Sequence, residues 1–412
     1  MKAPPTLGFT GQRFAGLGLA GLAAALAAPA HAENAFSGDQ LRGFLEVRAT
    51  AADGARGWLD DGDGKTRFGE GGHGLADAML VWRPHLTWSL DAHVTLLADT
   101  QADPALDIGE AYLSYRGPPA AGWRLSARAG LFYPPVSLEH DGVGWTPTYT
   151  ITPSALNSWI SEEVKVGAAE ITARREFGAQ DLSVSAALFG FNDTAGTLLA
   201  FRGWALGDVM AGAFGKVPLP AYSYQRATAP VRELDGRIGY YARVRYRPAG
   251  PLALEAFYYD NAGDRVSDKN GQTDWDTSFA ELGADLALGA KSRLLLQVMN
   301  GRTRWGQPTA QGYWSDLDFT AAYALVTHDI GANTITARWD YFDLRDRSGF
   351  DPADNGETGW AATAAYIAPL SPSWRLAFEA MHVSSDRPER DEIGLAPRQR
   401  QSILQSSLKF SF

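Results

Sequence analysis

Arginine recurs in this 412-residue sequence at positions of equal parity within short stretches. In an extended strand, alternate residues point to the same side, so residues of equal parity share one face of a sheet. A guanidinium group stays charged and donates paired hydrogen bonds to a carboxylate or a phosphate. The spacing therefore predicts ladders of positive charge on one face of a β-structure. Their members are Arg237, Arg243, Arg245 and Arg247 on one stretch, and Arg124 and Arg128 on another.

Further charges are expected on the same face. Arg293 and Arg338 fall in the charged phase of their own stretches, and Lys165 does so if a bulge at 168–169 shifts the register. The proline-rich segment 134–162 carries carboxylates, and we expect it to fold inward as a constriction that sets Glu139 and Asp141 opposite the arginines. Opposed charges of this kind create a transverse field, which orients dipolar solutes and sets ion preference.

The same charges also suit a purely structural role. Arg245 and Glu255 lie on adjacent stretches and would pair as a salt bridge that holds a wall together. The formal net charge of −10 favours cations at an entrance, whereas the arginine ladders favour anions. Because salt screens fields beyond about 8 Å, local charge outweighs distant charge, and a weak anion preference is the expectation. Both roles of these charged residues, a ladder that sets ion selectivity and salt bridges that hold the wall, stay as alternatives.

The sequence gives little support for catalysis, metal binding or nucleic-acid binding. The absence of cysteine excludes thiol catalysis and cysteine-bound metals, and the acidic charge argues against a nucleic-acid partner. Segment 60–64 has the aspartates of a calcium loop without its full spacing, and no Gly-x-Ser-x-Gly nucleophile elbow occurs. We therefore expect no catalytic residue, no cofactor and no metal site.

The elements that would carry these charges are β-strands. From about Leu41 onward, stretches of roughly ten residues alternate apolar and polar side chains, as a tilted transmembrane strand does. In 251–260, small and apolar residues take one phase and Glu255 lies in the other. Tryptophan and tyrosine stand near the ends of the apolar face, as in interfacial girdles. These positions are Trp82, Trp88, Trp123, Tyr133, Trp339, Tyr341, Trp360 and Trp374.

Short and long connections alternate along the chain. Seven short turns and eight long polar loops join sixteen stretches, which is the pattern of an outer-membrane barrel with short periplasmic turns and long extracellular loops. The apolar segment 197–214 would give eighteen strands if it were counted as two, and we assign it to the fourth long loop. The prediction is an all-β, transmembrane antiparallel β-barrel over 33–412, which encloses an aqueous lumen at this strand number.

The first 32 residues have the order of a secretory signal peptide. Lys2 and Arg13 are their only charged residues, an apolar run follows from Phe14 to Ala28, and Ala30-His31-Ala32 forms a cleavage site. Removal of 1–32 changes the formal net charge from −10 to −12, because it removes two basic residues and no acidic one. The protein is therefore expected to be exported to the bacterial outer membrane.

With its leader, strand rhythm and terminal Phe412, the chain resembles a bacterial outer-membrane porin. The resemblance implies that Phe412 is the assembly signal, that segment 134–162 narrows the lumen, and that the partners are outer-membrane lipid and two further copies in a homotrimer. Segment 130–139, Gly-Leu-Phe-Tyr-Pro-Pro-Val-Ser-Leu-Glu, is similar to a motif of the phosphate-selective porin O and P family. The loops lack that family's lysine cluster, so phosphate selectivity is not implied.

The expected function is passive diffusion of small hydrophilic solutes or ions through a water-filled channel with a mixed-charge lumen. Two alternatives are an outer-membrane enzyme and a binding or adhesion barrel without an open pore. An enzyme of this kind would place a serine, histidine and acid group at the rim, and the sequence shows none. The sequence does not identify the solute.

Overall fold

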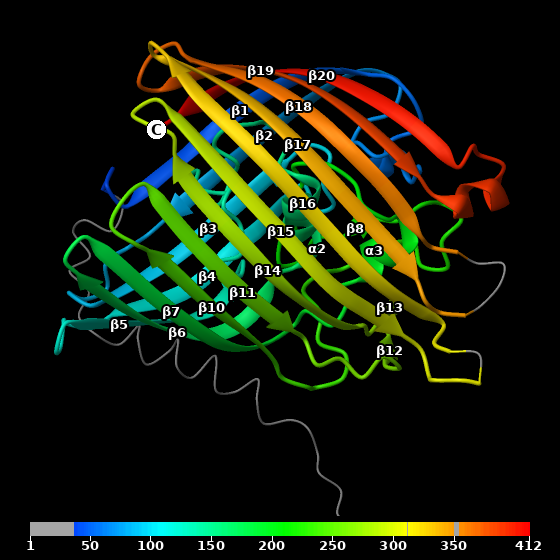
Figure 1. The fold of residues 1–412 in the computed structure, drawn as a ribbon, viewed down its shortest axis with the longest axis horizontal. Coiled ribbons are helices and arrows are strands. Elements are labelled where there is room, and N and C mark those ends of the chain that lie inside the picture. The colour runs from blue at the N-terminus through cyan, green and yellow to red at the C-terminus, as the bar shows by residue number, and fades with distance from the viewer. Residues whose placement is uncertain (1–36, 311, 350–353) are drawn as a thin grey trace, which may run out of the picture.

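The computed structural model describes residues 37–310, 312–349 and 354–412, so the predicted signal peptide lies outside the described residues. Sixteen antiparallel strands close into one barrel, as predicted (Figure 1). The barrel strands are β1 (Leu41–Ala52), β2 (Gly71–Trp82), β3 (Leu90–Asp99), β4 (Leu106–Arg116), β5 (Trp123–Phe132), β6 (Val166–Phe177), β7 (Gln180–Gly190), β10 (Gly239–Arg247), β11 (Leu252–Asp260), β14 (Asp276–Ala287), β15 (Ser292–Trp305), β16 (Ser315–Ile330), β17 (Asn333–Asp346), β18 (Glu357–Pro369), β19 (Trp374–Asp386) and β20 (Arg398–Ser411).

Smaller elements lie in the long loops. They are the helices α2 (Ala155–Glu163) and α3 (Thr197–Phe201), the 3₁₀ helices η2 (Trp58–Asp60) and η3 (Pro388–Ile393), and two short hairpins, β8 (Val217–Pro218) with β9 (Ala227–Thr228) and β12 (Asp268–Lys269) with β13 (Gln272–Thr273). Segment 197–214 contributes α3 and no barrel strand, which agrees with its assignment to the fourth long loop.

The first and last strands close the barrel. β1 pairs with β20 from Phe44 opposite Ser411 to Ala52 opposite Ile403. Beyond this register, Gly43 and Phe412 exchange two backbone hydrogen bonds of 3.1 Å. Closure satisfies the backbone groups of the edge strands, which a membrane-spanning sheet requires.

The predicted alternation places apolar residues outside. In β11, Leu254 and Tyr258 are exposed and Glu255, Phe257 and Tyr259 are buried. An exposed apolar outer face of this extent suits contact with lipid. Trp88, Trp339, Trp360 and Trp374 are also exposed, but the girdle prediction is wrong for Tyr133, which is buried. No helix in the described part of the chain is long and apolar enough to cross a membrane.

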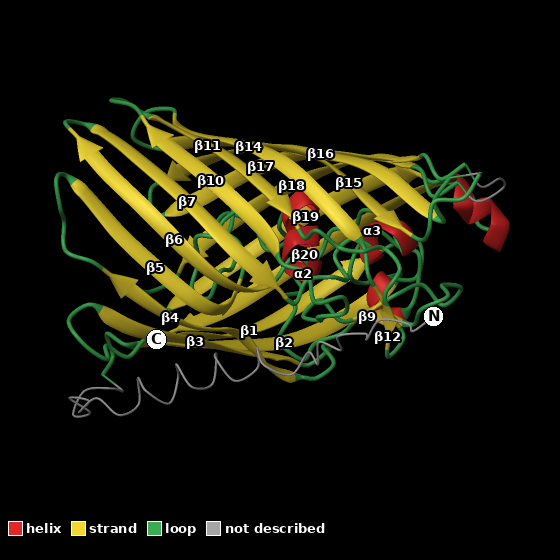
Figure 2. Cartoon of the chain, turned by 90° about the horizontal axis from the view of Figure 1, so that it is seen from below, coloured by secondary structure: helices red, strands yellow, loops and turns green. Residues whose placement is uncertain are grey.

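Three long loops fold into the lumen from the long-loop end of the barrel (Figure 2). They are residues 53–70, 133–165 and 191–238, and each contributes fully buried side chains. Trp159 of α2 packs edge-on against Phe279 of β14 and Phe319 of β16, with ring centroids 5.6 and 5.3 Å apart. Trp204 of the third of these loops lies 6.1 Å from Trp159.

The expectation of a charged, wet inner face is therefore wrong for the long-loop half. Inward-facing aromatic residues of β11, β14, β16 and β17 pack against the loops as a hydrophobic core. The charged inner positions lie mainly in the other half, toward the short turns. The filled half also contains buried ion pairs, such as Lys65 with Glu357, Arg202 with Glu162 and Arg390 with Asp63.

Candidate functional site

Loop 133–165 crosses the lumen and binds the opposite wall. It leaves β5, yet the backbone N–H of Leu138 donates to Gln297 of β15 over 3.0 Å, and that of Ile151 donates to Glu379 of β19 over 2.7 Å. The N–H of Ala155 donates to Asp340 of β17 over 3.1 Å. The loop includes the whole predicted segment 134–162, and these contacts place it inside the barrel.

Arg338 of β17 is the centre of this attachment. Its guanidinium group is fully buried and donates to Glu139 over 3.1 Å, to Asp340 over 2.9 Å, and to the carbonyl oxygens of Thr152 and Pro153 over 2.7 and 3.0 Å. Glu139 also accepts from the N–H of Ser154 and the amide of Asn157. The prediction that Arg338 and Glu139 line the open lumen is wrong, because both side chains are buried and form hydrogen bonds between the loop and the wall.

Helix α2 then joins two of the loops. Ser154 caps it by accepting from the N–H of Asn157 over 3.2 Å, and all nine helical residues are buried. Glu163 accepts from Trp159 within the helix and from the N–H groups of Gly196 and Leu198 in loop 191–238, each over 3.0 Å or less. Motion of one loop therefore requires motion of the other.

One polar cavity of about 190 Å³ lies between loop 133–165 and the wall. Arg243, Arg245 and Arg293 line it together with Asp285, and Asp141 faces them from the loop. Two of these arginines are tightly paired. Arg243 lies 2.5 Å from Glu255, and Arg293 binds both oxygens of Asp285 over 2.6 Å.

Arg245 differs from its neighbours. It is 4.0 Å from both Glu255 and Asp285, and its side chain is 35% exposed. It therefore keeps more of its charge available to the cavity than Arg243 or Arg293 does. The structure thus brings four of the predicted residues together, namely Asp141, Arg243, Arg245 and Arg293, and within this group the salt bridges that the sequence left as an alternative are also present.

The remaining predicted residues lie elsewhere. Arg128 binds Glu170 with two hydrogen bonds, of 2.8 and 3.0 Å, and Arg124 and Arg247 are exposed near the short-turn ends of β5 and β10. Arg237 precedes β10 and is exposed beside Asp235. The pairing of β6 runs without a shift from Gly167, so the expected bulge is absent. Lys165 is buried before β6 and donates to the carbonyl oxygens of Gly109 and Ala211, which contradicts a lumen-lining position.

An aromatic stack supports the loop side of the polar cavity. Tyr133 stacks on Trp145 at 4.1 Å and Trp145 on His140 at 3.9 Å, with the rings within 9° of parallel. Burial and the nearby Arg338 lower the pKa of His140 to about 3. The imidazole is therefore neutral at physiological pH, and Asp141 next to it supplies the charge of this part of the loop.

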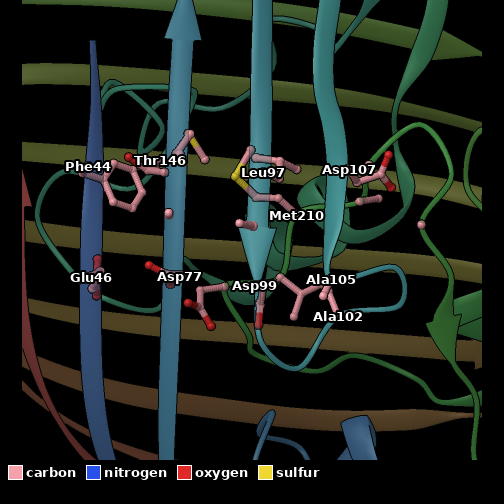
Figure 3. Close-up of a pocket in the computed structure, with 18 of the residues that line it drawn as sticks. Phe44, Glu46, Asp77, Leu97, Asp99, Ala102, Ala105, Asp107, Thr146 and Met210 are labelled. Atoms are coloured by element: carbon pink, nitrogen blue, oxygen red, sulfur yellow. The ribbon is translucent and has the colours of Figure 1, made fainter.

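A second cavity, of about 100 Å³, lies between the inner wall of β1–β4 and residues 208–217 (Figure 3). Met79, Leu97 and Met210 form an apolar part of its lining, and Figure 3 shows Leu97 next to Met210, with Glu46, Asp77 and Asp99 below. Sequence reasoning missed this cavity. The loop residue Asp208, which lies 2.6 Å from Arg48, belongs to no strand pattern and gave no signal.

Carboxylates of the long loops form two groups that share Asp235. Within each group, ligand oxygens lie within 4.8 Å of one another. The groups are Asp193, Glu233 and Asp235, and Asp235, Asp264 and Asp274. An all-oxygen set of this kind suits a hard cation such as Ca²⁺. These are the described residues best placed to hold a metal ion, and the expectation of no metal site remains a prediction.

Comparison with known proteins identifies the fold. No family model matches the sequence, and no curated protein matches it. Among solved structures, the outer-membrane channel DcaP of Acinetobacter baumannii aligns with a TM-score of 0.55 and 13% identity, over 90% of this chain and 96% of that one. A loop L8 deletion mutant of OmpT, an outer-membrane protein of Vibrio cholerae, aligns with a TM-score of 0.53 and 10% identity, over 90% and 99%.

The anion-selective porin from Comamonas acidovorans aligns with a TM-score of 0.48 and 12% identity, over 90% of this chain and 98% of that one. Of these three structures, the two with TM-scores above 0.5 are an outer-membrane channel and an outer-membrane protein. The chain has the sixteen-stranded fold of an outer-membrane barrel, with an apolar outer face for that location. At these identities the likeness extends to the fold alone.

Proposed function

We propose that this barrel is an outer-membrane channel for passive diffusion of small hydrophilic solutes or ions, and that it is not an enzyme. The observation that carries the proposal is the pair of charged cavities between the inner wall and the loops that cross the lumen. In this proposal the buried Arg338 holds loop 133–165 against the far wall and so sets the width of the path for solutes. Loop 133–165 is then the constriction.

The proposed ion preference is weak and favours anions. Three guanidinium groups and two carboxylates line the polar cavity. Glu255 and Asp285 neutralise Arg243 and Arg293, which leaves Arg245 on the wall and Asp141 on the loop as the charges of the cavity without a close partner among the described residues. A homotrimer in outer-membrane lipid is the assembly that the porin resemblance implies, and it forms part of this proposal.

One observation favours a second candidate, a binding barrel without a continuous pore. The aromatic core of Trp159, Trp204 and their neighbours fills the long-loop half of the lumen. If no water-filled path passes beside this core, solutes bind in the cavities and do not cross. The two candidates differ in conductance.

Single-channel recording in a planar bilayer under a salt gradient tests both candidates. Stepwise ohmic conductance supports the channel, three-fold grouped steps support the trimer, and a reversal potential of the anion-selective sign supports the cavity charges. Arg245→Glu should shift the reversal potential toward cation selectivity. Lys291→Glu makes the same charge change on the exposed short turn between β14 and β15, outside the cavity. Equal shifts of the reversal potential in the two variants would assign ion selectivity to the entrance and not to the cavity. If folded protein shows no conductance, the binding barrel is favoured.

A further inference from the structure

Five charged residues form one row around the inner wall, on five adjacent strands. Register pairing joins Arg375 to Lys409, Lys409 to Glu46, Glu46 to Asp77, and Asp77 to Asp99. The two basic residues lie on β19 and β20, and the three acidic ones on β1, β2 and β3. All five line the second cavity, and Figure 3 shows the acids side by side on neighbouring strands. The basic residues thus lie at one end of the row and the acidic residues at the other, and Arg48, which also lines the cavity, lies between Glu46 and Asp77 at 3.0 and 3.6 Å.

Lys409 and Glu46 neutralise each other within the row and Asp99 is paired with Arg67 over 2.6 Å, whereas Arg375 and Asp77 keep unused bonding capacity. Lys409 lies 2.6 Å from Glu46. In the described part of the chain no carboxylate lies within 4 Å of the Arg375 guanidinium, and its buried Nε has no hydrogen-bond partner. Asp77 has one oxygen 3.6 Å from Arg48, while its buried Oδ1 has no partner. A buried polar atom without a partner is costly, so Arg375 and Asp77 each have hydrogen-bonding capacity that the protein does not use, and both residues line the cavity.

The space between these groups is small and partly apolar. Met79, Leu97 and Met210 contribute hydrocarbon surface to a volume of about 100 Å³. For comparison, an apolar cavity of about 150 Å³ accommodates benzene. The cavity therefore admits a solute of a few heavy atoms with a short apolar part.

From this arrangement we propose that the second cavity is a binding site for small zwitterions of the α-amino acid class, along the path of the proposed channel. The solute carboxylate binds the Arg375 guanidinium group, which has no carboxylate partner in the described ranges, and its ammonium group binds the Asp77 carboxylate. The short side chain contacts the apolar wall. The inference rests on the proposed channel function and names the solute that the channel favours.

Swelling of proteoliposomes at pH 7 tests this with four solutes of equal heavy-atom number. Alanine is the zwitterion, lactamide the neutral solute, lactate the anion and alaninamide the cation. Alanine should enter faster than lactamide through the unmodified protein. Arg375→Gln and Asp77→Asn should each lower the affinity for alanine by roughly tenfold or more, because each removes one hydrogen bond between charged groups.

The two variants should differ in the solute they come to favour. Arg375→Gln shifts the preference toward alaninamide, and Asp77→Asn shifts it toward lactate. Arg345→Gln and Asp329→Asn serve as matched controls on exposed positions outside the cavity and should leave the alanine-to-lactamide ratio unchanged. Heat-modifiability on gels verifies that each variant folds.

The outcomes separate the inference from the channel function. If lactamide enters but alanine has no advantage, or if the two variants leave the ratio unchanged, the channel stands and the zwitterion site is refuted. If lactamide does not enter, the channel proposal fails, and binding of radiolabelled alanine to folded protein in detergent decides about the site. Saturable binding that both variants weaken supports the zwitterion site. The absence of saturable binding overturns it.

Discussion

Replacement of Arg338 by methionine should release the tip of loop 133–165 from β17. The change keeps side-chain volume and leaves Glu139 and Asp340 as buried carboxylates without their cation. Removal of one partner from a buried ion pair costs about 3–5 kcal/mol. Because 1.4 kcal/mol corresponds to a tenfold change in an equilibrium, the open population of the tip should rise by roughly a hundredfold to a few thousandfold.

Helix α2 should stay in place in this variant. Leu156 and Ile160 are fully buried, and burial of two such side chains contributes about 3–6 kcal/mol that does not depend on Arg338. Ile151 also keeps its hydrogen bond to Glu379. The expected result is therefore local opening, with larger or noisier conductance steps and a lower temperature of heat modification, in a barrel that still assembles.

Arg345→Met is the matched control for this experiment. Arg345 lies on the same strand and pairs with Asp343 over 3.1 Å, but its side chain is 70% exposed. An exposed pair contributes about 0–1 kcal/mol, so this variant should behave as the unmodified protein does. Unchanged conductance and unchanged heat modification in Arg338→Met would refute the view that Arg338 anchors the loop.

Two further predictions concern pH and assembly. The pKa of His140 is about 3 in the folded protein and 6.5 in the unfolded protein. The neutral imidazole therefore contributes its full stabilisation of the folded state above pH 6.5, and this stabilisation is lost as the pH falls toward 3. At pH 4 the loss in the free energy of unfolding is about 3 kcal/mol. His140→Phe keeps the stack on Trp145 and should reduce the fall in melting temperature between pH 6.5 and 4. The control His328→Phe, at an exposed position, should leave this fall unchanged. Parallel curves of melting temperature against pH for the unmodified protein and both variants would contradict the prediction. Deletion of Phe412 removes two backbone hydrogen bonds at the β1–β20 seam and should reduce insertion into membranes, measured as the heat-modifiable fraction, while Phe412→Trp should assemble normally; full assembly of the deletion variant would show that the seam does not need it.

The wall of the barrel was predictable because its rules are local. Alternation over ten residues fixes which side chains face outward, and the lengths of the connections fix the number of strands. Leu254 and Glu255 are neighbours in one strand and therefore point to opposite faces. Once the apolar Leu254 is placed on the lipid face, Glu255 must point into the lumen. Segment 197–214, whose apolar residues resemble a strand, lies in the fourth long loop as predicted, although eighteen strands would also have closed the barrel.

The contents of the lumen were not predictable by the same rules. Parity places Glu255 and Phe257 on one inner face, but it does not tell whether water or a loop covers them. Arg245 and Arg338 look equivalent in sequence, since each is an inward-facing arginine on a strand. Arg338 becomes an anchor because Glu139, 199 residues away, reaches it across the lumen.

A signal for the filled half was nevertheless present in the loops. An exposed loop gains nothing from Leu198, Leu199 or Trp204, because apolar side chains lower the free energy only where they leave water. Their presence in a connection between two strands of a closed barrel indicates that the loop is covered, and the lumen is the one place where a loop of such a barrel can bury them away from lipid. Some charged residues beside these loops keep no close ion-pair partner within the part of the chain that the structure describes. There Arg245 and Arg375 lack the close partners that Arg338 has, and these are the positions at which a passing solute would meet uncompensated charge.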